Sequence, residues 1–107
     1  MNETFEDEDN ALPAVPEGGL LSVLPVINRR GLHARASAKF VQTVERFDAI
    51  VTVTRAGETV GGRSIMGLLT LGAAQGTSVA VTAVGADAEI CLAAITELLA
   101  NRFGEDE

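Results

Sequence analysis

The segment around Ile50-Val-Thr-Val-Thr54 most constrains how this chain folds, because a tight turn and a short second β-type run follow it at once. Ala49 to Arg55 is β-branched and alternates with the period of two that is typical of a strand. Ala56-Gly57-Glu58 has the composition of a turn, and the chain returns over 59–62. The middle of the chain is therefore predicted to be an antiparallel hairpin, around which the other elements are arranged.

Segments on both sides of this hairpin have clear strand or helix patterns. Strands are predicted over 20–27 and 77–84, which are rich in valine and leucine. Apolar residues recur at helical spacing over 34–47, over 65–71 behind Ser64 as N-cap, and in a last helix that opens at Asp87 as cap and stops before Gly104. The order β-α-β-β-α-β-α predicts an α+β fold with two layers, in which helices cover one face of a mostly antiparallel sheet.

The length and the charge pattern predict one domain with acidic ends. A chain of 107 residues with 47% hydrophobic content suits a single modest core, which we assign to 19–104. Residues 1–18 combine acids with proline and glycine, so we expect a disordered extension that either only solubilises the chain or folds back over basic residues. Residues 105–107 form a short acidic tail. All eight basic residues lie between Arg29 and Arg102, so the net charge of −7 arises from the two ends.

Several classes of protein fit this composition poorly. No apolar run is long enough to cross a membrane, and the acidic start is unlike a secretory signal. The single cysteine, Cys91, forms no internal disulfide, so we expect a cytoplasmic protein. Cys91 lies on the apolar stripe of the last helix, which favours core packing over a thiol nucleophile. One histidine and one cysteine are too few for a zinc site, and no nucleotide-binding fingerprint is present, so no metal or cofactor is expected.

The only histidine, His33, is the strongest candidate for chemistry. It lies in Asn28-Arg-Arg-Gly-Leu-His-Ala-Arg-Ala-Ser37, where a strand-like run turns at Gly31 and a helical pattern begins. The free N–H groups at the start of a helix favour anions, and Arg35 can donate two hydrogen bonds to phosphoryl oxygens. Because a neutral imidazole is a good nucleophile and has an ordinary pKa near 6.5, this arrangement suits a histidine that carries a phosphoryl group. We therefore expect the ring to be exposed, uncharged and close to positive charge.

Two motifs make the chain resemble a known family. Gly31-Leu-His-Ala-Arg-Ala-Ser37, together with Ser64-Ile-Met-Gly-Leu-Leu-Thr-Leu-Gly72 and Gln75-Gly76, strongly resembles HPr, the histidine-containing phosphocarrier family of the bacterial phosphoenolpyruvate-dependent phosphotransferase system. The resemblance covers about residues 20–103. It implies an HPr-like open-faced β-sandwich with four antiparallel strands under three helices, which agrees with the order of elements above.

The resemblance also implies roles for individual residues. His33 would accept a phosphoryl group on Nδ1 from phosphorylated enzyme I and pass it to EIIA-type proteins, with Arg35 neutralising the phosphoryl charge. Ser64 would be a regulatory site for an HPr kinase/phosphorylase. The partner-binding surface would consist of Ala34, Ala38, Ile65, Met66 and Leu69. The protein would act as a monomeric, stoichiometric phosphocarrier and not as a standalone enzyme. Ala36 stands where many members have proline. We expect this to make the first helical turn less rigid without loss of activity.

Alternatives to these interpretations remain. Ser64 can serve as a helix cap alone, whether or not it is phosphorylated. The apolar residues after Ser64 can all be buried, although they are more numerous than a short helix needs. A regulatory binding module controlled through Ser64 would pass no phosphate onward, and the presence of His33 counts against it. A nucleic-acid-binding role for the arginines is disfavoured, because the chain has no Trp or Tyr and its ends are acidic.

Overall fold

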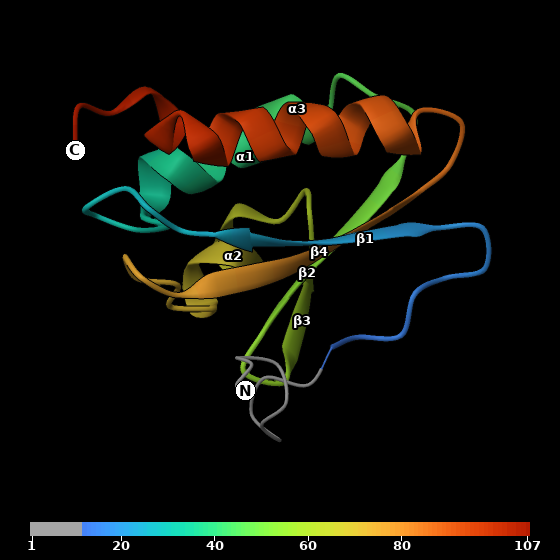
Figure 1. Cartoon of the computed structure of the whole chain (residues 1–107), viewed down its shortest axis with the longest axis horizontal. Coiled ribbons are helices and arrows are strands. Elements are labelled where there is room, and N and C mark those ends of the chain that lie inside the picture. The colour runs from blue at the N-terminus through green and yellow to red at the C-terminus, as the bar shows by residue number, and fades with distance from the viewer. Residues whose placement is uncertain (1–11) are drawn as a thin grey trace.

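The computed structural model describes residues 12–107. An antiparallel sheet forms one layer, and helices pack against it (Figure 1). The bounds are β1 Leu20–Pro25, α1 Ala34–Val44, β2 Ile50–Arg55, β3 Glu58–Gly61, α2 Ile65–Thr70, β4 Ser78–Val84, α3 Ala88–Ala100 and the short 3-10 helix η3 Arg102–Gly104. The four strands lie in the order β1-β4-β2-β3, and every neighbouring pair is antiparallel. The predicted α+β fold is confirmed, including the hairpin between β2 and β3.

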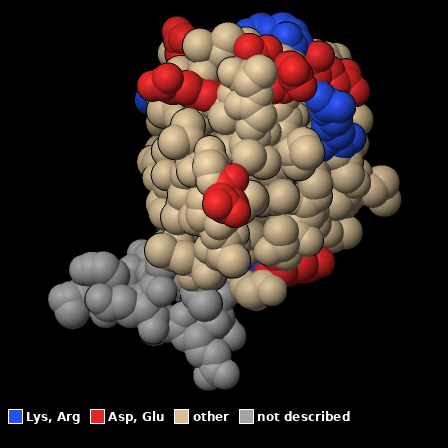
Figure 2. Space-filling view, turned by 90° about the vertical axis from the view of Figure 1, so that its right-hand side faces the viewer, with Lys and Arg blue, Asp and Glu red and all other residues tan. Residues whose placement is uncertain are grey.

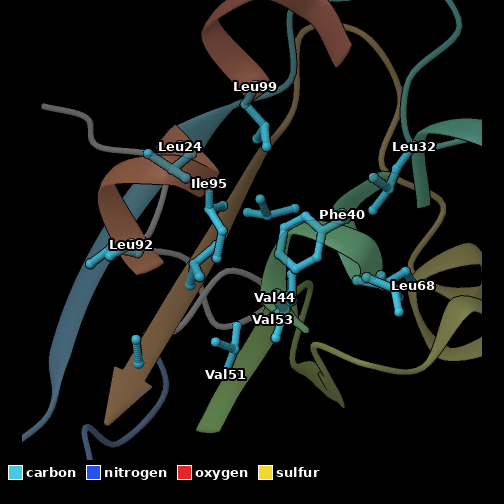
Figure 3. Close-up of a cluster of buried hydrophobic side chains, with 14 of the residues drawn as sticks. Leu24, Leu32, Phe40, Val44, Val51, Val53, Leu68, Leu92, Ile95 and Leu99 are labelled. Atoms are coloured by element: carbon cyan, nitrogen blue, oxygen red, sulfur yellow. The ribbon is translucent and has the colours of Figure 1, made fainter. Parts of the chain in front are cut away.

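The core lies between the sheet and the helices, and Phe40 of α1 is at its centre (Figure 3). Side chains from α3, such as Ile95 and Leu99, approach Phe40 from one side, and Val53 of β2 lies beneath it. Leu68 of α2 also packs in this cluster. These positions are the apolar stripes that the helical and alternating patterns predicted. Cys91 is also fully buried, and burial raises the pKa of its thiol, which agrees with core packing.

Three local predictions need correction. The first helix ends at Val44 and not at Phe47, because the backbone N–H groups of residues 46 and 47 bond three residues back and tighten the chain into turns. The helical spacing over 34–47 predicts Thr43 on the polar face of the helix, but Thr43 is buried, and its hydroxyl donates to the Lys39 carbonyl. Asp87 occupies the N-cap position of α3, but its side chain makes no capping bond and instead accepts from the backbone N–H of Asp48.

The two acidic ends differ in how much of them the structure describes. Residues 1–11, the larger part of the predicted disordered extension, lie outside the described residues. Residues 12–18 have no helix or strand and end in a turn in which the N–H of Gly19 donates to the Pro16 carbonyl. The C-terminal residues 105–107 lie beside the loop that leads into α1, as Figure 1 shows at the end marked C. The short acidic tail is therefore in contact with the loop that contains His33.

Candidate functional site

The loop between β1 and α1 places His33 at the start of a helix. Gly31 adopts the left-handed region (φ +68°), and the next N–H, of Leu32, donates to the Ala73 carbonyl over 2.9 Å. A Cβ at residue 31 would lie 2.4 Å from that same carbonyl oxygen, so the close approach of these two loops requires glycine. His33 follows in extended conformation as the N-cap of α1. The predicted position of the imidazole at a helix N-terminus is confirmed.

Both ring nitrogens of His33 have partners. Nδ1 accepts a hydrogen bond from the backbone N–H of Arg35 over 3.3 Å, so the ring caps its own helix. Nε2 pairs with the Oε2 of Glu105 in the C-terminal tail. The His33 side chain is 16% exposed, which is less than we expected, because the tail carboxylate covers one edge of the ring. An acceptor on one side and an N–H donor on the other favour the tautomer with the proton on Nε2 and the lone pair on Nδ1.

Glu105 is itself held by a buried amide. Asn28 Nδ2 donates to Glu105 Oε1 over 3.0 Å and to the Gly31 carbonyl over 2.8 Å, and Asn28 is fully buried. Partial burial alone would raise the pKa of Glu105, but the hydrogen bonds from Asn28 and His33 and the charge of Arg30 outweigh it, so the pKa lies below its ordinary value. Neither Asn28 nor Glu105 was predicted as a site residue from the sequence. No local pattern identifies this contact, because the two residues are 77 positions apart.

A sharp reversal after α3 brings the tail to the ring. Arg102, Phe103 and Gly104 all have positive φ, and the first two lack the freedom of glycine. Phe103 is 1% exposed and anchors the turn in the core, and Lys39 Nζ donates to its carbonyl over 2.6 Å. Glu107 also binds the tail to the loop before α1. Its main-chain oxygen accepts from the Arg29 N–H, and its side-chain carboxylate pairs with the Arg29 guanidinium.

A charged hollow lies between the loop before α1 and the C-terminal tail, and Glu105 is part of its lining. It has a volume of about 620 Å³. Four cations line one side, Arg29, Arg30, Arg35 and Lys39, and the acidic tail residues Glu105, Asp106 and Glu107 line the other. The exposed side chain of Arg35 brings one of these cations close to the start of α1, while the carboxylates of the tail offset much of the positive charge of the hollow. Arg63, directly before the second motif, does not line the hollow and instead donates to the Phe47 carbonyl over 3.4 Å.

Comparison with known proteins assigns this site to a family. Residues 22–101 match the family model described as "PTS HPr component phosphorylation site". The phosphocarrier protein HPr of Xylella fastidiosa (strain Temecula1) is 46% identical over 83 residues, which cover 78% of this chain and 93% of that protein. The HPr of Neisseria meningitidis serogroup A is also 46% identical, over 78% of this chain and 94% of the relative. The chain belongs to the HPr family.

The solved structures agree with this membership. HPr-C-His from Thermoanaerobacter tengcongensis superposes with a TM-score of 0.79 and 36% identity, over 82% of this chain and 99% of that one. As a member of the HPr family, the chain is a phosphoryl carrier of the phosphotransferase system, as its motifs implied. The open-faced sandwich that the resemblance implied is likewise confirmed.

The second HPr motif forms the start of α2. Ser64 is exposed, and its Oγ accepts from the Gly67 N–H over 2.9 Å, so the predicted N-cap is confirmed. Leu68 and Leu71 are buried, whereas Ile65 is 40% and Met66 70% exposed, and Leu69 is half-buried. The alternative in which all five apolar side chains are buried is therefore wrong. Because α2 packs against α1, this apolar surface adjoins the helix that His33 caps.

The end of the molecule that lies opposite His33 and the C-terminal tail has a different surface. Figure 2 shows acidic and basic side chains intermingled over the helical layer, with a mostly uncharged flank below them. This end faces away from the C-terminus of Figure 1 and thus from the charged hollow. Within residues 12–107, no helix is long and apolar enough to cross a membrane.

Proposed function

We propose that His33 is the phosphoryl acceptor of this chain and that the group is carried on Nδ1. The observation that supports this most is the lone pair of Nδ1, which points at the start of α1 while Nε2 is occupied by Glu105. Phosphorylated enzyme I is the donor in this proposal, and an EIIA-type protein is the acceptor. We also propose that the phosphocarrier domain covers 19–104, with its elements running from β1 to η3, and that the acidic tail 105–107 packs against it.

The surroundings of Nδ1 suit a phosphoryl group. The backbone N–H groups at the start of α1 and the helix dipole favour negative charge there, and the Arg35 N–H already points at Nδ1. A phosphoryl group on Nδ1 would take over the acceptor role that the ring now plays for that N–H. The guanidinium of Arg35 is exposed and free to approach its oxygens, so Arg35 would stabilise the charge that develops during transfer.

The apolar surface next to the helix would bind the partners. Exposed apolar side chains that are grouped together mark interaction surfaces, and Met66 and Ile65 are the most exposed of this group. Ala34 is exposed and Ala38 half-buried on α1, so neither obstructs a protein that approaches both helices. We propose that Ala34, Ala38, Ile65, Met66 and Leu69 contact enzyme I and EIIA-type proteins in turn. The carrier would act as a cytoplasmic monomer.

The position of Ser64 supports regulation of the carrier by phosphorylation. Its hydroxyl is exposed at the start of α2, next to Ile65 and Met66, so a kinase can reach it. Phosphorylation by an HPr kinase/phosphorylase would add about two negative charges to the partner-binding surface. Binding of acidic partners would then weaken while the fold is retained, since a phosphate is tolerated at a helix N-terminus. A regulatory module without onward transfer would show this Ser64 modification but no phosphate exchange through His33.

Incubation with phosphoenolpyruvate and enzyme I tests the assignment. The full chain should acquire one acid-labile phosphate, and His33→Ala should acquire none. Arg35→Ala should remain folded by circular dichroism but accept phosphate more slowly. Phosphate retained in His33→Ala would refute the role of His33, and unchanged kinetics in Arg35→Ala would remove Arg35 from the mechanism.

A further inference from the structure

We propose that Glu105 is a positioning residue for phosphoryl transfer, which fixes the proton of His33 on Nε2 and so keeps the lone pair of Nδ1 available. This inference rests on the proposed role of His33. The Glu105 carboxylate accepts from Nε2–H, and the Arg35 N–H donates to Nδ1, so the two contacts require the same tautomer. A second group that orients a nucleophilic imidazole in this way is a recurrent arrangement in catalytic and metal sites.

The contact is built into the fold and is not a chance approach of a loose end. Glu105 is 18% exposed at its side chain, and its other oxygen is bound by the buried amide of Asn28. The reversal at Arg102 and Phe103 places two non-glycine residues in the left-handed region, which a residue with a Cβ adopts only where its surroundings hold it there. The buried ring of Phe103 and the bond from Lys39 to its carbonyl hold this reversal in place.

The transfer step shows why the position of the proton matters. The Nδ1 lone pair forms a bond to phosphorus, while the bond between phosphorus and the donor atom breaks and its electron pair stays on the donor. The proton on Nε2 does not move, and the ring gains the positive charge that the donor loses. Glu105 then stands as the counter-ion beside Nε2, with its carboxylate already fixed by Asn28. With the proton on Nδ1 instead, no lone pair would face the phosphorus.

The variant Glu105→Gln tests this with almost no change of shape. Asn28 Nδ2 is fixed by the Gly31 carbonyl, so the oxygen of the new amide would remain with Asn28. Its NH2 group would then face His33 Nε2 and favour a proton on Nδ1, which is the wrong tautomer. Asp106→Asn is the matched control, since it removes one charge from the same tail at an exposed residue.

The first measurement is the ¹⁵N NMR of the ring, which is unambiguous because the chain has a single histidine. The parent and Asp106→Asn should show a protonated Nε2 and an unprotonated Nδ1 in the neutral ring, whereas Glu105→Gln should shift the proton toward Nδ1. An identical tautomer in all three proteins would overturn the proposal. This readout uses no phosphoryl transfer, so it can fail while the role of His33 stands.

The second measurement is the turnover of enzyme I with the full chain as phosphoryl acceptor. Glu105→Gln should lower kcat about ten- to a hundredfold, the loss typical when a metal-binding histidine loses the carboxylate that orients it, with little change in KM. Asp106→Asn should change kcat far less. Equal losses of kcat in the two variants would mean that only the negative charge of the tail matters. A higher kcat in Glu105→Gln would mean that the carboxylate hinders transfer. Either result contradicts the proposal.

Discussion

The variant Gly31→Ala tests whether the close approach of two loops sets the position of His33. Residue 31 has φ +68°, and an added Cβ would lie 2.4 Å from the Ala73 carbonyl oxygen and 3.0 Å from the Cα of Ala74. The left-handed conformation alone costs a residue with a Cβ about 1 kcal/mol. The contact with Ala73 adds to this, because backbone atoms must separate and the bond from the Leu32 N–H to the same carbonyl, worth about 1 kcal/mol, is lost or lengthened. We expect a total loss of about 2 to 4 kcal/mol of unfolding free energy.

Gly72→Ala is the matched control for this prediction. Gly72 has almost the same φ, +62°, but nothing lies within 4 Å of the Cβ that alanine would add. Urea denaturation followed by circular dichroism should therefore give a loss of about 1 kcal/mol for Gly72→Ala and clearly more for Gly31→Ala. Equal losses in the two variants would mean that the loops separate freely, and the argument that glycine fixes the start of α1 would be wrong.

Three further predictions concern the cap, the docking surface and the tail. Ser64→Ala should lower the unfolding free energy by about 1 kcal/mol in urea denaturation, because it removes the bond to the Gly67 N–H; no loss would contradict the capping role. Met66→Ser should leave stability within about 0.5 kcal/mol but raise the KM of enzyme I for the carrier several-fold, and an unchanged KM would exclude Met66 from the docking surface. Because the pKa of Glu105 is lowered in the folded protein, its ionised carboxylate stabilises the fold at pH values above the ordinary carboxyl pKa of about 4.3. This stabilisation is lost as the pH falls through the lower pKa of the folded state. The stability difference between the parent and Glu105→Gln, followed by urea denaturation across pH, should thus be largest near neutral pH and vanish in acid, and a pH-independent difference would contradict the contact.

The elements with regular periodicity were predictable from the sequence. The alternation of residues 50–54 and the helical spacing of Phe40, Val41 and Val44 reflect which side chains the sheet and helices bury, so local pattern and packing agree. The N-cap role of Ser64 was predictable for the same reason, since its partner, Gly67, is three residues away. His33 stood out because a single histidine followed a glycine turn at the start of a helical pattern.

Features that depend on contacts distant in sequence were not predictable. Asp87 has the residue type of a cap, but the N–H of Asp48 competes for its carboxylate in the folded chain. Glu105 looked like part of a solvated tail, and only the reversal at Phe103 brings it to His33. The same contact explains why the ring is less exposed than its sequence context indicated. Composition alone contains no signal for such a pairing, because neither a turn motif nor a charge run predicts which carboxylate reaches the ring.

The sharpest test of the carrier role of His33 is to locate the phosphoryl group on the phosphorylated protein. NMR of the ¹⁵N-labelled phosphoprotein can detect the coupling between phosphorus and the ring nitrogen that carries it. We expect coupling to Nδ1 of His33, with Nε2 still protonated next to Glu105. Coupling to Nε2, or a phosphate on any residue other than His33, would contradict it.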